Sequence, residues 1–189
     1  RYVPALVGVG RSWLNLASGW HREPGPASEH ATEALRRALD LDPSNAVAHT
    51  LLGAIRHQYD YDWSGARECF ERAVALEPHA SFVHSAYGYH LLVRGEFEAA
   101  ESEIALARRL DPQYANARMH MVNLRIAQGR LDDAEAELAA MSDIAPESAP
   151  GAGLAAVIAM IRGDAHAAMA HYVRACELGA EYPNCYASL

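Results

Sequence analysis

Prolines recur at a nearly constant interval, and this period constrains the fold more than any other feature of the chain. Four of the nine prolines show it: Pro43, Pro78, Pro112 and Pro146 lie 35, 34 and 34 residues apart. A period of this length is typical of proteins built from stacked supersecondary units. We therefore expect a series of similar units rather than one globular core.

Each interval also carries three apolar residues with helical spacing. Their i, i+4, i+7 pattern places the three side chains on one face of a helix. The triplets are Ala31, Leu35 and Ala38; Ala66, Phe70 and Ala73; Ala100, Ile104 and Ala107; Ala134, Leu138 and Met141; and Ala168, Tyr172 and Ala175. Glycine precedes three of them by five residues, where it can end the previous helix in a left-handed conformation. The pattern predicts pairs of antiparallel helices, with a glycine turn inside each pair and a proline turn between pairs.

This unit resembles the tetratricopeptide repeat. The family motif has a Leu-Gly pair in the first helix, followed by Ala-x3-Phe and a closing Pro in the second. Leu52-Gly53 and Tyr87-Gly88 stand at the Leu-Gly pair, and Ala66, Phe70 and Pro78 complete one repeat. The resemblance implies an all-α fold, a right-handed superhelical solenoid of about five helix-turn-helix hairpins. We expect a single domain over 1–189 with repeats at about 10–44, 46–80, 81–114, 115–148 and 149–182, and a capping helix that begins within 183–189.

The helices are expected near 4–20, 27–40, 45–57, 63–76, 80–93, 97–109, 114–127, 131–143, 149–161 and 165–178. The prolines at 24 and 26 predict a loop before the second helix. The segment from Tyr59 to Trp63 adds one residue to the turn of the second repeat, and Asp62 is expected to cap the helix that follows. This aromatic turn is similar to turns in tetratricopeptide segments of large bacterial regulators.

Composition excludes several classes of protein. The net charge is −8, and all 16 basic residues are arginines that form no basic stripe, which argues against nucleic-acid binding. No apolar run reaches 18 residues, so no membrane span is expected. The abundance of arginine and alanine indicates a bacterial source. The three cysteines, Cys69, Cys176 and Cys185, lack metal or redox spacing, and we expect them to be reduced in a cytoplasmic protein.

No pattern of reactive residues predicts an enzyme. The chain lacks a nucleophile motif, a phosphate loop and a dinucleotide fingerprint. Histidines five apart, such as His166 and His171, diverge around a helix by about 140° and do not form a metal site. The sequence therefore predicts no catalytic residue, no cofactor and no metal.

The family resemblance implies that the first helices of the hairpins line a concave groove. The groove residues are then expected to include His57, Phe82, Ser85, Tyr89, Asn116, Met119, Asn123 and Ile126. Aromatic and Met side chains offer contact area, and Asn can both donate to and accept from a peptide backbone. We expect a non-catalytic scaffold that binds a protein or peptide with apolar anchors, and that can form a homo-oligomer through its terminal helices. The alternative is a sensor or regulatory segment of a larger bacterial transcription or signalling protein.

Overall fold

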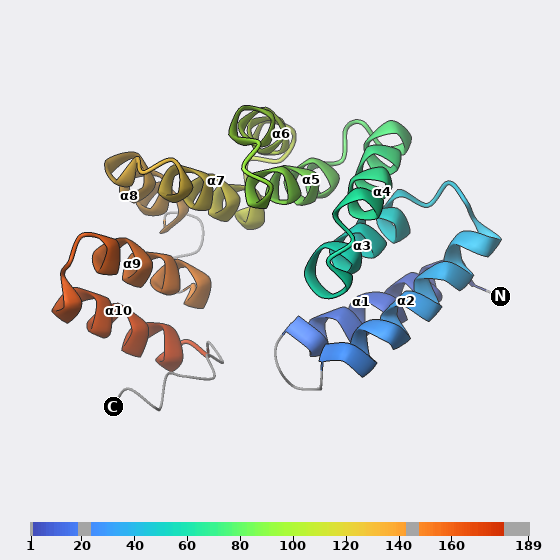
Figure 1. Ribbon diagram of the computed structural model, residues 1–189, viewed down its shortest axis with the longest axis horizontal. Coiled ribbons are helices and arrows are strands. Elements are labelled where there is room, and N and C mark those ends of the chain that lie inside the picture. Colours follow the sequence, from blue (N-terminus) through green and yellow to red (C-terminus); the bar gives the residue numbers. More distant parts are fainter. Residues whose placement is uncertain (1, 19–23, 143–147, 180–189) are drawn as a thin grey trace.

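The computed structural model describes residues 2–18, 24–142 and 148–179. Within these ranges the chain is helical throughout and contains no strand. The elements are α1 (Val3–Ser18), α2 (Pro24–Leu41), α3 (Ala46–Ile55), the π-helical turn η1 (Arg56–Asp60), α4 (Trp63–Leu76), α5 (Ser81–Val93), α6 (Phe97–Leu110), α7 (Ala115–Ala127), α8 (Leu131–Ser142), α9 (Ala149–Ile161) and α10 (Ala165–Glu177). They pair into five hairpins that follow one another around an arc (Figure 1). The prediction of an all-α superhelical solenoid of about five hairpins is confirmed.

The apolar triplets of the second helices form the core between the layers. Their small outer members, such as Ala100 and Ala107, are completely buried. The large middle residues Leu35, Phe70 and Ile104 are also at most 2% exposed. Leu138 and Tyr172, which hold the middle position in the last two triplets, are only partly buried. The pattern therefore predicts the buried face well in the first three hairpins and less completely toward the C-terminus.

Glycine turns join the helices within the last three hairpins, as predicted. Gly95, Gly129 and Gly163 have φ values of +76°, +73° and +82°, a region that residues with a Cβ rarely adopt. At the first of these turns the Glu96 amide donates to the Leu91 carbonyl, which satisfies one of the last acceptors of α5. Each of these first helices thus ends in a left-handed glycine turn.

Gly88 lets the two helices of the third hairpin approach closely. A Cβ at this position would lie 2.6 Å from Cγ1 of Ile104 and 3.2 Å from the Ile104 backbone nitrogen. Gly53, at the same place in the preceding repeat, faces Phe70 in a similar way. The glycine of the Leu-Gly pair is therefore a packing residue of the hairpin.

We predict that Gly88→Ala lowers the free energy of unfolding by about 1–2 kcal/mol. Overpacking costs about 1–3 kcal/mol, and the better helix propensity of alanine offsets up to about 1 kcal/mol. Urea unfolding followed by circular dichroism measures the change. Gly8→Ala is the matched control, because a Cβ at Gly8 of α1 meets no atom within 4 Å and should be neutral or stabilising. Equal effects of the two substitutions would contradict the packing role.

The extra residue of the second repeat is accommodated by η1. The Tyr61 amide donates to the Arg56 carbonyl five residues earlier, and Tyr61 itself is left-handed with φ of 53°. A wide turn of this kind inserts one residue into a helix without breaking its hydrogen bonding. Asp62 then caps α4 as predicted, since its carboxylate accepts from the Gly65 amide at 2.9 Å.

The predicted loop before the second helix is wrong. Helix α2 begins at Pro24, so the prolines at 24 and 26 lie in its first turn. The first amides of a helix have no partner within it, and proline therefore costs little there. Other predicted features lie outside the described residues: the ends of the helices expected at 4–20 and 131–143, Pro146, Cys185 and the capping helix expected within 183–189.

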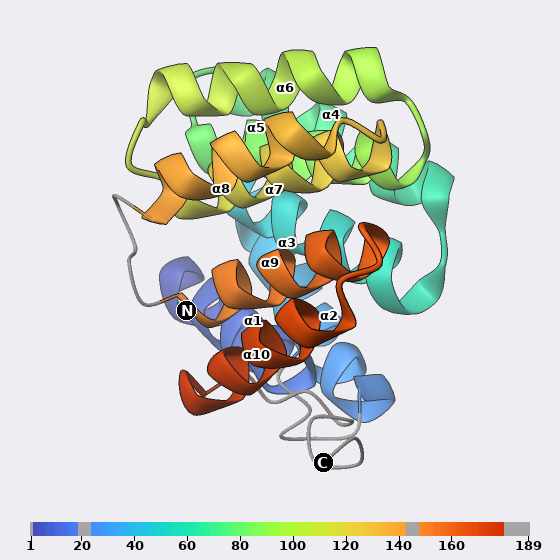
Figure 2. The same cartoon turned by 90° about the vertical axis from the view of Figure 1, so that its left-hand side faces the viewer.

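The helices span no membrane within the described ranges, because none is both long and apolar enough. Seen from the side of the last hairpins, α6, α8, α9 and α10 lie in successive layers from one end of the molecule to the other (Figure 2). Ion pairs connect neighbouring hairpins across these layers. Arg125 of α7 pairs with Glu101 of α6 at 2.7 Å, and Arg108 of α6 with Glu137 of α8 at 2.9 Å.

Candidate functional site

The first helices of the five hairpins form the inner layer of the arc. In the described ranges α1, α3, α5, α7 and α9 contact one another in sequence, whereas the second helices of neighbouring hairpins show no comparable contact. Neighbouring hairpins pack through the second helix of one and the first helix of the next, and the first helices also contact one another, so the row curves with the first helices on its inner side (Figure 1). We call the surface formed by these five first helices the concave face.

The concave face is built from helices without carboxylates. None of the 24 Asp and Glu residues lies within the bounds of α1, α3, α5, α7 or α9. These five helices contain three arginines, and two of them have partners within the chain. Arg118 donates to the Pro112 carbonyl, and Arg125 pairs with Glu101. The inner layer is therefore apolar and histidine-rich, although the chain as a whole is acidic.

A row of aromatic rings crosses the concave face from one hairpin to the next. Tyr89 of α5 lies between His57 of η1 and His120 of α7, with ring centroids 5.7 Å and 4.7 Å apart. Trp63, at the start of α4, meets the His57 ring edge-on at 5.1 Å. The Nδ1 atom of His120 also lies 3.0 Å from the Ser85 hydroxyl. We call Trp63, His57, Tyr89 and His120 the aromatic row.

His57 of the aromatic row shares a hydrogen bond with a second buried imidazole, that of His90. The Nδ1 atoms of His57 and His90 are 3.1 Å apart, so one ring donates and the other accepts. Burial lowers the pKa of both rings, and that of His90 falls to about 4, where the nearby His57 contributes as well. Burial likewise lowers the pKa of His120 to about 4. These imidazoles are neutral at pH 7 and behave as polar aromatic packing residues.

The predicted groove residues differ in how much surface they offer. Asn116 is exposed, while Phe82, Tyr89, Met119, Asn123 and Ile126 are half-buried. His57 and Ser85 are only 7% and 1% exposed, so they offer almost no contact area. Phe82 and Ile126 partly serve the core, since each packs against a buried cluster. In the structure His57 lies next to Tyr89, and Ser85 lies next to His120. The sequence pattern predicts neither contact, and His120 is not among the predicted groove residues.

A signal for His120 exists in the sequence. It lies four residues after Asn116 and three before Asn123, which places all three side chains on one face of α7. The sequence gives no comparable indication for Trp63. Its contact with His57 depends on the π-helical turn η1, which the sequence pattern does not predict. The most open part of the predicted groove is therefore the α7 stretch from Asn116 to Asn123, next to Tyr89.

The described residues offer no metal site or reactive thiol. No group of three or more His, Cys, Asp and Glu side chains among them is arranged to hold a metal ion. Cys69 is buried and free, and burial raises the pKa of its thiol, which makes it a poor nucleophile. Cys176 is disulfide-bonded, so the expectation that all cysteines are reduced is wrong at this position.

Comparison with known proteins assigns the repeat. Residues 104–158 match the family model of the tetratricopeptide repeat. No curated protein matches the chain. Among solved structures, TTC0263, a thermophilic tetratricopeptide repeat protein of Thermus thermophilus, is similar with a TM-score of 0.78 at 20% identity, and the match covers 95% of this chain and 96% of that one.

Two further structures are similar over most of their length. PilF of Pseudomonas aeruginosa has a TM-score of 0.72 at 19% identity, with 97% of this chain and 79% of that one covered. YrrB, described as a tetratricopeptide repeat protein with an unusual peptide-binding site, has a TM-score of 0.57 at 20% identity, with coverage of 93% and 89%. Residues 104–158 thus match the tetratricopeptide repeat family itself, and the chain as a whole has the fold of tetratricopeptide repeat proteins.

Proposed function

We propose that the chain is a non-catalytic scaffold that binds an apolar, uncharged protein segment on its concave face. Proteins of this fold are in general scaffolds for protein–protein interaction. The observation that carries the proposal is the absence of carboxylates from the five helices of the inner layer. In an acidic chain, this segregation leaves one extended surface on which an apolar segment meets no buried charge.

The stretch from Asn116 to Asn123 provides the contacts that such a segment needs. Tyr89 and Met119 are half-buried, so they offer apolar area that is already held in place. Asn123 can bind backbone groups of an extended partner through its amide. The peptide-binding site for which YrrB is described supports the same use of this fold.

The proposal predicts what a peptide selection will yield. We expect random 12-residue peptides selected on the immobilised chain to be enriched in apolar residues and poor in charged ones, with affinity that changes little with salt. Tyr89→Ala and Met119→Glu should each weaken the selected peptides by about 2 kcal/mol, or roughly 30-fold, because both alter the centre of the contact. Fluorescence anisotropy measures the affinities.

Met169→Glu is the matched control, because Met169 is 43% exposed on α10, outside the inner layer. It should leave the affinity unchanged. Peptides rich in charge, or peptides that bind Met119→Glu as well as the unaltered chain, would rule out the concave face as the site.

Several broader expectations join this proposal. We propose that the five hairpins act as one domain, because consecutive hairpins contact each other. We also propose that the chain pairs with itself through a terminal hairpin.

The regulatory-segment alternative rests on the turn at 59–63 alone, and that turn is explained by η1 and its aromatic packing. A cytoplasmic location stays a prediction, against which the disulfide at Cys176 stands, since disulfides are rare in the cytosol.

A further inference from the structure

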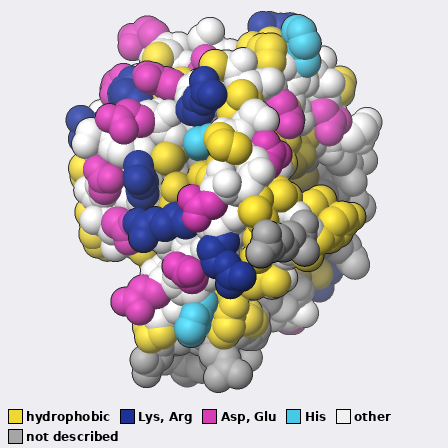
Figure 3. Space-filling view, turned by 90° about the vertical axis from the view of Figure 1, so that its right-hand side faces the viewer, with side chains coloured by type: hydrophobic (Ala, Val, Ile, Leu, Met, Phe, Trp, Pro, Cys, Tyr) yellow, Lys and Arg dark blue, Asp and Glu magenta, His cyan; other side chains and the backbone are white. Residues whose placement is uncertain are grey.

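The N-terminal hairpin presents an apolar face that no described helix covers. The first helix of each later hairpin packs on the second helix of the hairpin before it, whereas α1 packs closely only on α2 and α3 among the described helices. Tyr2, Val9 and Leu41 are 70%, 46% and 47% exposed on this face. Figure 3 shows hydrophobic side chains gathered on this side of the molecule beside a band of Arg, Asp and Glu. An exposed apolar patch of this kind is a candidate interaction surface.

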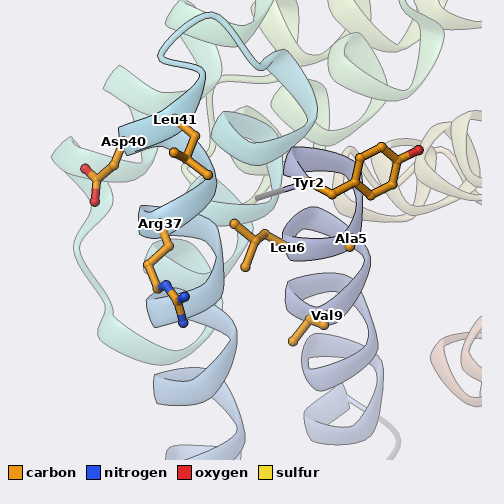
Figure 4. A pocket seen from close by; sticks show the side chains of 7 residues that line it. All are labelled: Tyr2, Ala5, Leu6, Val9, Arg37, Asp40 and Leu41. Atoms are coloured by element: carbon orange, nitrogen blue, oxygen red, sulfur yellow. The ribbon is translucent and has the colours of Figure 1, made fainter.

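A pocket of about 500 Å³ lies between α1 and α2 on this face. Leu6 and Val9 of α1 point toward α2, which contributes Arg37, Asp40 and Leu41 to the pocket lining (Figure 4). The apolar residues of α1 and the charged residues of α2 thus form one surface, which we call the N-terminal face.

The charges of the N-terminal face have opposite signs. Arg37 and Asp40 are exposed, one helical turn apart, and neither has a hydrogen bond or ion pair within the described part of the chain. At the last three junctions between hairpins, by contrast, an apolar contact is accompanied by an Arg–carboxylate pair. These pairs are Arg67 with Glu96, Arg125 with Glu101, and Arg162 with Glu135. The N-terminal face also combines apolar side chains with one cation and one anion. Here, however, the two charged residues, Arg37 and Asp40, lie on the same surface.

We propose that the N-terminal face is the interface between two copies of this chain related by a two-fold axis. This inference rests on the self-association proposed above and assigns its residues. A surface that carries both a cation and an anion can be complementary to itself, because a two-fold axis can bring Arg37 of each copy against Asp40 of the other. Two such pairs then flank an apolar centre that contains Val9 and Leu41.

Sedimentation equilibrium of the 189-residue chain tests the interface. We expect a reversible monomer–dimer equilibrium that Val9→Glu weakens by at least about tenfold, because two like charges then meet at the centre. The control is Ile161→Glu, which alters a side chain that is 54% exposed on the last hairpin and should leave the dimer unchanged. Circular dichroism establishes that both variants remain folded.

Charge exchange gives a sharper second test. Arg37→Asp and Asp40→Arg should each weaken the dimer, the double exchange should restore it, and the two single variants should pair with each other when mixed. A chain that stays monomeric at every concentration overturns both self-association and this interface. A dimer that survives Val9→Glu, or that Ile161→Glu abolishes instead, overturns the interface alone.

Discussion

Lowering the pH from 7.5 to 4.5 should cost the chain about 2–3 kcal/mol of stability through His90 alone. The pKa of this ring falls from 6.5 to about 4 in the folded chain, mainly through burial. Between these values the unfolded chain binds the proton and the folded chain does not, so protonation favours unfolding. The stabilisation is complete above pH 6.5 and is lost as the pH falls toward 4. Each tenfold difference in proton affinity between the two states corresponds to about 1.4 kcal/mol.

The buried position of His90 makes the effect large. Its ring is 1% exposed, its Nδ1 bonds only to His57, and its Nε2 has no partner among the described residues. A positive charge on this ring would therefore lie among Phe70, Tyr87 and Trp63 without a carboxylate bonded to it. His120, whose pKa is also lowered to about 4 through burial, adds a further loss by the same linkage.

Urea unfolding at a series of pH values measures this dependence. His90→Asn keeps an amide next to His57 but cannot titrate, so its stability should change much less than that of the unaltered chain between pH 7.5 and 4.5. His166→Asn is the matched control, because His166 is exposed on α10 and its loss should leave the pH dependence intact. A His90→Asn variant with the full pH dependence would contradict the role of the buried pair.

Phe70→Ala should lower the free energy of unfolding by about 3–5 kcal/mol, the range for removing a large aromatic side chain from a core. Phe70 is 2% exposed, and its ring stacks on Tyr87 and contacts His90 in the next hairpin. It also faces Gly53 in its own hairpin. Truncation therefore removes contacts within the second hairpin and contacts that join it to the third.

Thermal and urea unfolding followed by circular dichroism measure the loss. Val93→Ala is the control, since Val93 is 48% exposed and its truncation should cost less than about 0.5 kcal/mol. We expect the Phe70 variant to unfold in two steps or over a broader range, because hairpins are stable only through their neighbours. A loss near that of Val93→Ala would show that the second and third hairpins are coupled elsewhere.

The sequence predicts those parts of the fold that depend on neighbours close in the chain. The triplets and the glycine turns follow from helical spacing and from one backbone conformation, and both are present as expected. The loop predicted before α2 is wrong because proline also suits the first turn of a helix. The sequence shows that the turn of the second repeat is one residue longer than the others. It does not show that this residue is accommodated as the π-helical turn η1, because that depends on how Trp63 and His57 pack.

The candidate site is harder to predict, because its contacts join residues that are far apart in the chain. Register identifies the helix face of a residue, but not which neighbouring side chain covers it. The sequence predicts that His57 lines the groove, yet its ring is buried among Tyr89, Trp63 and His90. Ser85 is covered by His120 from the next hairpin. Such contacts join residues far apart in the chain, and they depend on the angle between hairpins, which one sequence does not reveal.

The uneven contact between the two layers has a mechanical consequence. The inner helices contact one another all along the arc, while on the outside the long side chains of Arg108 and Glu137 join the second helices of two neighbouring hairpins. Hairpins that are packed on the inner side and only bridged by side chains on the outer side change their curvature more easily than they slide past one another. Salt screens these outer ion pairs but not the apolar contacts between the inner helices, so added salt should loosen the outer side of the solenoid before the inner side.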